Sequence, residues 1–141
     1  MSYFEIKGVL PPMITPFQAD GAVDYKLFTE NIQRWNTTGM AGYLVLGSNS
    51  ETPCLTEAEK LELVRLTAEN AAPNKLIMAG TGLESTSATI ELTNKAADQG
   101  AQCALLLTPN YYGGAMGDEA QIAYFTEVAE HTKIPILIYN V

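Results

Sequence analysis

The sequence predicts an α/β fold built around a parallel sheet, and three observations support this prediction. Short apolar runs recur about every 30 residues, which is the length of one strand-helix unit. Stretches with helical spacing and capping residues lie between these runs, and each run stops at small or polar residues. Because ligands bind at the carboxyl ends of the strands in parallel α/β folds, we look for the function in the five tails that follow these runs.

The apolar runs are interpreted as five strands because each is short and bounded by turn residues. They cover residues 8–15, 42–46, 76–80, 104–108 and 135–139. The first run is the weakest strand, since Pro11 and Pro12 cannot donate hydrogen bonds to a sheet ladder.

Four helices are predicted between the strands from capping residues and apolar spacing. They cover residues 25–38, the stretch after residue 56, residues 86–99 and residues 118–131. Asp24 is the expected N-cap of the first helix, and Thr56 with Glu59 forms a capping box for the second. Asp118, with Gln121 three residues on, is the expected cap of the fourth.

Strands and helices in this order allow two closures: an open doubly wound sheet or part of an eight-stranded barrel. A typical (β/α)8 barrel needs about 250 residues, so residues 1–141 would form about half of one domain. A half barrel leaves its interior uncovered and its edge strands unpaired. We therefore expect further chain or a homo-oligomer, as a dimer or tetramer, and we expect this sequence to be part of a longer protein.

The composition is that of an ordinary globular protein, and it disfavours some classes of partner. With 8 Lys and Arg against 16 Asp and Glu, the net charge of -8 argues against nucleic acid and anionic membranes as partners. No apolar run approaches the roughly 20 residues that a membrane helix needs. Cys54 and Cys103 have neither zinc-site spacing nor a disulfide pattern, so we expect a cytoplasmic location.

The tail after residue 46 is the first candidate site. Gly47, Ser48 and Asn49 offer successive backbone N–H groups and short polar side chains at a strand end, which suits a bound carboxylate. The alternative is an ordinary turn in which Ser48 and Asn49 satisfy their own backbone.

Three tyrosines are further candidates. Tyr139 falls where the inside of a barrel would meet its mouth, and a phenol there can transfer a proton. Its alternative is a core tyrosine whose hydroxyl bonds to the backbone. Tyr111 and Tyr112 lie on a glycine-rich loop, where packing or an interface role is the alternative.

The lysines are informative through their positions. All six precede a strand or lie on a helix: Lys7, Lys26, Lys60, Lys75, Lys95 and Lys133. None is placed at the carboxyl end of a strand, so no amine is positioned for Schiff-base chemistry there. The single histidine, His131, closes a helix, and neither a metal site nor a cofactor site is indicated.

The chain resembles the N-terminal part of the dihydrodipicolinate synthase / N-acetylneuraminate lyase family, the class I aldolases. The matching segments span the whole chain: residues 8–17 (GVLPPMITPF), 47–51 (GSNSE), 55–56 with Glu59, 79–82 (AGTG), 108–112 (TPNYY) and 135–141 (PILIYNV). The resemblance implies a (β/α)8 barrel whose members cleave or form carbon-carbon bonds of 2-oxo acids such as pyruvate.

The family uses a Schiff base on a lysine at the end of the sixth strand. By resemblance, Gly47, Ser48 and Asn49 bind the oxo-acid carboxylate, and Ser48 also relays protons. Tyr139 is the general acid and base, and Tyr111 completes the relay across a dimer interface, with Tyr112 as the alternative assignment.

Two departures from the family pattern bear on function. The tail of residues 48–51 (SNSE) replaces the usual two threonines, glycine and glutamate, and with residues 84–89 (ESTSAT) it is more similar to the 4-hydroxy-2-oxoglutarate aldolase branch. The sequence also stops before a sixth strand, so the Schiff-base lysine is missing. The runner-up is a non-catalytic half barrel that self-associates and at most binds small anions, and a flavodoxin-like binding module is a third alternative.

Overall fold

The computed structural model describes residues 6–140, which form four parallel strands alternating with four helices. The helices are α1 (Tyr25–Asn36), α2 (Glu57–Asn70), α3 (Thr86–Asp98) and α4 (Asp118–His131). The strands are β1 (Gly42–Val45), β2 (Leu76–Gly80), β3 (Cys103–Leu107) and β4 (Ile136–Tyr139). Three short 3-10 turns lie in the loops: η1 (Ser48–Ser50), η2 (Thr52–Cys54) and η3 (Gly113–Ala115).

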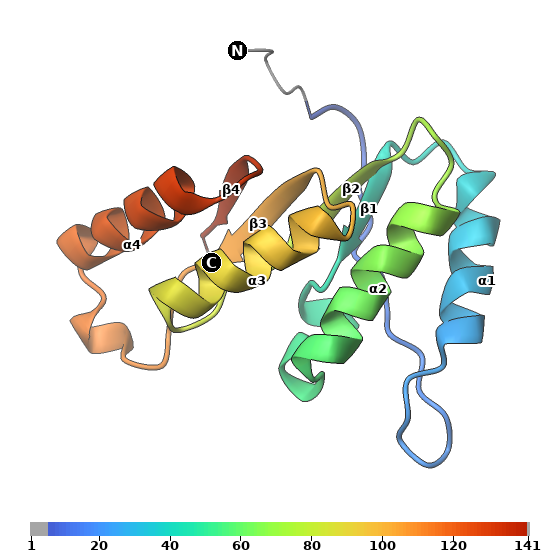
Figure 1. The fold of residues 1–141 in the computed structure, drawn as a ribbon, viewed down its shortest axis with the longest axis horizontal. Coiled ribbons are helices and arrows are strands. Elements are labelled where there is room, and N and C mark those ends of the chain that lie inside the picture. The colour runs from blue at the N-terminus through green and yellow to red at the C-terminus, as the bar shows by residue number, and fades with distance from the viewer. Residues whose placement is uncertain (1–5, 141) are drawn as a thin grey trace.

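The strand order decides between the two closures that the sequence allowed. The strands lie side by side in the order β1-β2-β3-β4, and every pair is parallel. Figure 1 shows the four helices in one layer on the same side of the sheet. A doubly wound sheet reverses its strand order at a switch point and carries helices on both faces, so this arrangement is that of a part-barrel.

The segment predicted as the first strand, residues 8–15, is not a strand in the structure. It runs beside β1 and pairs with it through a single parallel bridge between Pro12 and Leu44. Met13 N donates to Leu44 O (2.8 Å), and Leu44 N donates to Pro11 O (3.0 Å). Pro11 has no N–H group to donate to β1, and Met13 O accepts from the Ser50 hydroxyl, so the ladder stops on both sides of this bridge. The prediction that residues 8–15 form a regular strand is therefore wrong.

Two of the three predicted helix caps are confirmed. Asp24 caps α1 through its side chain, and Thr56 with Glu59 forms the complete capping box of α2. The predicted cap at Asp118 is wrong, because Gly117 is the N-cap and Asp118 is already the first residue of α4. The Asp118 carboxylate still lies in the first turn, where the helix dipole favours negative charge.

The core lies between the sheet and the helix layer. Alternation along β1 directs Tyr43 and Val45, both fully buried, into this core, while Leu44 faces the opposite side. That opposite face carries no helix, and on β4 it leaves Tyr139 45% exposed. Within residues 6–140, no helix is long and apolar enough to cross a membrane.

Candidate functional site

An open pocket of about 450 Å³ lies on the helix-free face of the sheet, toward the carboxyl ends of the strands. Its lining comes from the segment before α1, all four strands and the loops after β1 and β2: Pro12, Leu44, Leu46, Gly47, Ser48, Asn49, Thr52, Pro53, Gly80, Gly82, Leu105, Leu107 and Tyr139. The structure therefore brings four of the five predicted site residues, Gly47, Ser48, Asn49 and Tyr139, to one cavity.

The loop after β1 has an unusual backbone conformation. The strand ends at Val45 because Leu46 takes a φ of 63°, in the left-handed region that a leucine rarely adopts. The turn Ser48–Ser50 follows at once, and Glu51 has a second positive φ of 54°. Within the described part of the chain, the N–H groups of Ser48 and Asn49 have no hydrogen-bond acceptor, as expected for the first residues of a helical turn.

Buried hydrogen bonds hold this loop against the segment that precedes α1. Thr15 Oγ1 donates to Ser50 O (2.7 Å), and Ser50 Oγ donates to Met13 O (2.6 Å). Thr52 Oγ1 also donates to Gly47 O (3.0 Å). Thr15 and Ser50 are supporting residues that the sequence does not predict, since their only signal is a small polar side chain near a strand end.

Two glycines allow the strand ends to approach closely at the base of the pocket. A Cβ at Gly80 would overlap the Leu46 carbonyl oxygen, and a Cβ at Gly82 would lie 2.8 Å from Leu107 N. Any side chain at either position would therefore push neighbouring backbone apart. These glycines keep the strand ends together and leave space open above them.

The tyrosines occupy two different places. Tyr139 ends β4, beside Leu107 of β3, and lines the pocket. Tyr111 lies outside the pocket on the loop after β3, with 76% of its surface exposed, and its ring meets that of Tyr112 edge to face at 4.8 Å. Glu84 holds this loop by accepting hydrogen bonds from backbone N–H groups, which the sequence did not reveal.

The model of the dihydrodipicolinate synthetase family matches residues 5–141. The chain belongs to this family. Among curated relatives, it is 37% identical over 135 residues to 4-hydroxy-tetrahydrodipicolinate synthase of Methanothrix thermoacetophila, an alignment that covers 96% of this chain and 44% of the relative. The match to the same enzyme of Agrobacterium fabrum is 36% identical and covers 96% of this chain and 45% of that enzyme. The chain thus spans about half the length of the curated relatives it matches.

Solved structures of the family agree with the fold. Dihydrodipicolinate synthase of Aquifex aeolicus superposes with a TM-score of 0.89 at 32% identity, over 96% of this chain and 45% of that one. N-acetylneuraminate lyase of Mycoplasma synoviae gives a TM-score of 0.85 at 28% identity, over 96% of this chain and 46% of that one. A dihydrodipicolinate synthase of Acinetobacter baumannii in complex with pyruvate gives a TM-score of 0.89 at 33% identity, over 97% of this chain and 46% of that one. The fold is therefore the N-terminal part of the family's barrel.

All six lysines of this family member lie away from the pocket. Lys75 is buried at the amino end of β2, where its Nζ donates to Thr38 O (3.0 Å) and Met40 O (2.6 Å). Lys95 and Lys133 form ion pairs with carboxylates on the helical layer. Lys26 and Lys60 lie on helices α1 and α2, and Lys7 precedes the segment that pairs with β1. None of these amines is at the carboxyl end of a strand.

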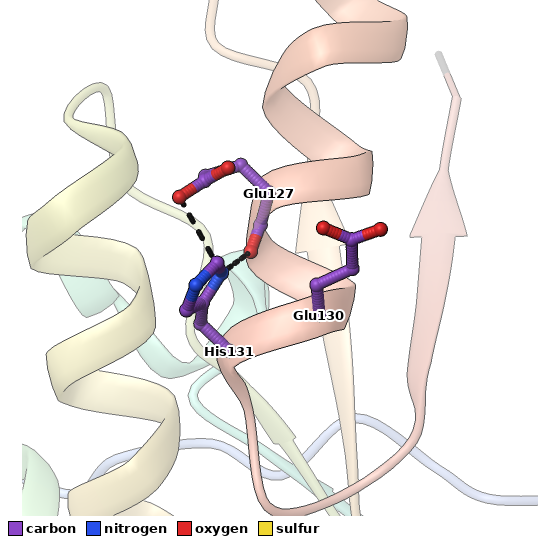
Figure 2. Close-up of side chains that lie close together, drawn as sticks. All are labelled: Glu127, Glu130 and His131. Atoms are coloured by element: carbon purple, nitrogen blue, oxygen red, sulfur yellow. Dashed lines mark hydrogen bonds and ion pairs between the residues drawn. The ribbon is translucent and has the colours of Figure 1, made fainter.

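His131 closes α4 as predicted, and two glutamates accompany it on the surface (Figure 2). The three side chains are exposed, with ligand atoms within 4.8 Å of one another. His131 Nδ1–H donates to Glu127 O (2.9 Å), and Nδ1 lies 3.4 Å from the Glu127 carboxylate. Figure 2 shows Glu130 on the other side of this pair, facing β4. We therefore assign His131 the role of an exposed helix cap.

Proposed function

We propose that this chain carries the substrate-carboxylate loop and the proton-transfer tyrosine of a class I aldolase or lyase that acts on 2-oxo acids. The observation that carries the proposal is that Gly47, Ser48, Asn49 and Tyr139 line one pocket in a member of this family. The presence of pyruvate in the Acinetobacter baumannii relative supports the choice of substrate class.

The proposed roles follow from the chemistry of each group. The unpaired N–H groups of Ser48 and Asn49 bind the oxo-acid carboxylate, as backbone N–H groups bind anions elsewhere. The phenol of Tyr139 donates and accepts the proton next to the imine, and the Ser48 hydroxyl relays it. Tyr111 completes this relay from a second subunit, which its exposed loop could offer across an interface.

The Schiff base needs an amine, which we propose is supplied by a lysine outside residues 1–141. The position of the six lysines on helices and at the amino ends of strands supports this. Residues 1–141 are then about half of one barrel domain and should be inactive alone by this route.

Within the family, we propose the 4-hydroxy-2-oxoglutarate aldolase branch, on the basis of residues 48–51 (SNSE) and 84–89 (ESTSAT). A direct comparison of two assays tests this assignment on the complete gene product. Retro-aldol cleavage of 4-hydroxy-2-oxoglutarate should be faster than condensation of pyruvate with aspartate semialdehyde. If the condensation is the faster reaction, the assignment to the aldolase branch is wrong and the protein acts as a synthase.

The second candidate is a non-catalytic half barrel that self-associates and at most binds small anions. Its support is the helix-free apolar face, on which Ile14 (51%), Leu107 (37%) and Tyr139 (45%) remain exposed, and the position of the six lysines away from the carboxyl ends of the strands. The two candidates differ in one measurable property, the formation of a covalent adduct with a 2-oxo acid.

Borohydride trapping with pyruvate, read by intact mass, tests the proposed function on this polypeptide and on any longer product of the same gene. An adduct only on the longer product supports the aldolase proposal and a lysine beyond Val141. No adduct on either favours the non-catalytic alternative. An adduct on the 141-residue chain would show that one of its own lysines reaches the substrate.

A further inference from the structure

We propose that Glu84 is a positioning residue that fixes the loop carrying Tyr111, and so sets where its phenol is presented. The inference rests on the proposed function, because it takes Tyr111 as the proton relay. Glu84 lies in the loop between β2 and α3, whereas Tyr111 lies in the loop between β3 and α4. The two loops are thus joined at the carboxyl-end rim of the sheet.

The contact is made by the Glu84 carboxylate and two successive backbone N–H groups. Glu84 Oε2 accepts from Asn110 N (3.1 Å) and from Tyr111 N (3.1 Å), and Oε1 also accepts from Asn110 N (3.2 Å). Hydrogen bonds in which the acceptor is charged are stronger than neutral ones. Holding two consecutive N–H groups fixes the orientation of the peptide from which the Tyr111 side chain projects.

Glu84 is itself held by a buried network. Tyr124 Oη donates to Leu83 O (3.0 Å) and lies 2.9 Å from Thr89 Oγ1. Leu83 N donates to Thr89 Oγ1 (3.0 Å). Thr89 is fully buried and Tyr124 is 5% exposed, so water does not compete for these bonds. The residue before Glu84 is therefore anchored to both α3 and α4.

The rest of the Tyr111 loop has few such anchors. Its internal bonds are local, with Gly113 N donating to Asn110 O (3.1 Å) and Ala115 N to Tyr112 O (2.7 Å). Among residues 6–140, Glu84 is the side chain outside this loop that bonds to its backbone at Asn110 and Tyr111. Without Glu84, the exposed tyrosine would sample several directions, and small misplacements of a reacting group are costly in rate.

The geometry also separates a positioning role from an electrostatic one. Oε2 accepts from both Asn110 N and Tyr111 N, so a neutral amide oxygen at the same place can keep these two bonds and gives up only the longer one from Asn110 N to Oε1. Glu84→Gln should therefore preserve the loop, whereas Glu84→Ala should release it. A role that depended on the negative charge would make the two variants equally impaired.

The test measures turnover and amide exchange on the complete gene product with Glu84→Ala, Glu84→Gln and the control Glu130→Ala. Glu130 is an exposed glutamate beside His131 at the end of α4, whereas this loop precedes the start of α4. We expect Glu84→Ala to lower kcat about 10-fold with little change in KM, and Glu84→Gln to stay within about 3-fold of the parent. Hydrogen exchange in a peptide covering residues 108–116 should be about 10-fold faster in Glu84→Ala alone.

Failure of this inference can be told from failure of the proposed function. If exchange in residues 108–116 is unchanged in Glu84→Ala, or if Glu84→Gln is as slow as Glu84→Ala, the positioning role is overturned. If Tyr111→Phe turns over like the parent protein, the relay is overturned and the effect of Glu84 on kcat loses its basis. Slowed turnover in both Tyr111→Phe and Glu84→Ala, with near-parent turnover in Glu84→Gln, supports both the relay role of Tyr111 and the positioning role of Glu84.

Discussion

At the end of β4, Tyr139 combines a fixed backbone with an accessible side chain. Its strand is paired with β3, while 45% of the residue remains exposed at the pocket. General acid-base groups contribute about 10²- to 10⁴-fold to rate. Tyr139→Phe removes only the hydroxyl, so kcat of the complete gene product should fall at least about 10²-fold while the fold is kept.

The matched control for this substitution is Tyr25→Phe, because Tyr25 begins α1, away from the pocket. The control should turn over like the parent protein. Steady-state kinetics with purified variants provides the measurement. A kcat for Tyr139→Phe equal to that of Tyr25→Phe would remove Tyr139 from the mechanism.

The two cysteines differ in reactivity. Cys54 is exposed, whereas Cys103 is fully buried in β3, and burial raises the pKa of its thiol to about 11. Since the thiolate is the reactive form, Cys103 should resist alkylation at pH 8 until the chain unfolds. Mass spectrometry after iodoacetamide treatment should find one modified thiol per native chain and two in denaturant. Two modified thiols in the native protein would contradict the packing around β3.

The site residues at the strand ends are predictable from the sequence because a parallel sheet brings the carboxyl ends of its strands together. Ser48 and Tyr139 are far apart in the chain, yet both line the pocket. The left-handed conformation of Leu46 could not be predicted, because leucine has no preference for it. The contacts of Ser50 with Thr15 likewise join residues 35 positions apart, for which a single sequence gives no pairing signal.

Among the elements, α2 has the most complete N-terminal cap. Thr56 Oγ1 accepts from Glu59 N, and the Glu59 carboxylate accepts from both the backbone and the hydroxyl of Thr56. Loss of an N-cap side chain costs about 1 kcal/mol. Thr56→Ala should therefore lower the free energy of unfolding by about this amount in denaturant titrations, with an unchanged m-value.

Thr126→Ala is the control for Thr56→Ala, since Thr126 is exposed in the middle of α4, where alanine favours the helix. Equal stability of the two variants would refute the capping contribution.

The hydrogen bonds from the Thr56 backbone and then its hydroxyl lower the pKa of Glu59. A carboxyl group whose pKa is lowered in the folded state stabilises the fold at pH values above the ordinary pKa of glutamate. This stabilisation is lost as the pH falls through the lowered pKa. The stability gap between the parent protein and Glu59→Gln should therefore narrow in acid.

Element boundaries were predictable where a local signal sufficed. The capping box and Asp24 are local patterns, and both predictions are confirmed. The two errors have physical causes. Residues 8–15 are apolar enough to predict a strand, but Pro11 lacks the N–H group that a ladder needs. Asp118 matches the pattern of a helix cap, but Gly117 occupies that position in the structure.

At the scale of the whole molecule, the sheet winds in one direction and leaves its inner face open. The order β1-β2-β3-β4 with one helical layer is that of the family's barrel, and strand count alone could not have separated it from a doubly wound sheet. Val9 (67%), Ile14 (51%) and Ile138 (56%) remain exposed.

Because large exposed apolar surfaces drive association, we predict that the protein forms a homo-oligomer. Sedimentation velocity at micromolar concentration should give the coefficient of a dimer or tetramer. High salt should not dissociate it, since hydrophobic contacts are not screened. A monomeric coefficient would contradict the prediction.

A crystal structure of the complete gene product after borohydride reduction with pyruvate would test the proposed roles of Ser48, Asn49 and Tyr139 together. We expect the pyruvate carboxylate to accept hydrogen bonds from the N–H groups of Ser48 and Asn49, with the Tyr139 hydroxyl beside the reduced carbon. A trapped adduct whose carboxylate lies away from this loop, or whose reacting carbon lies beyond reach of Tyr139, would contradict it.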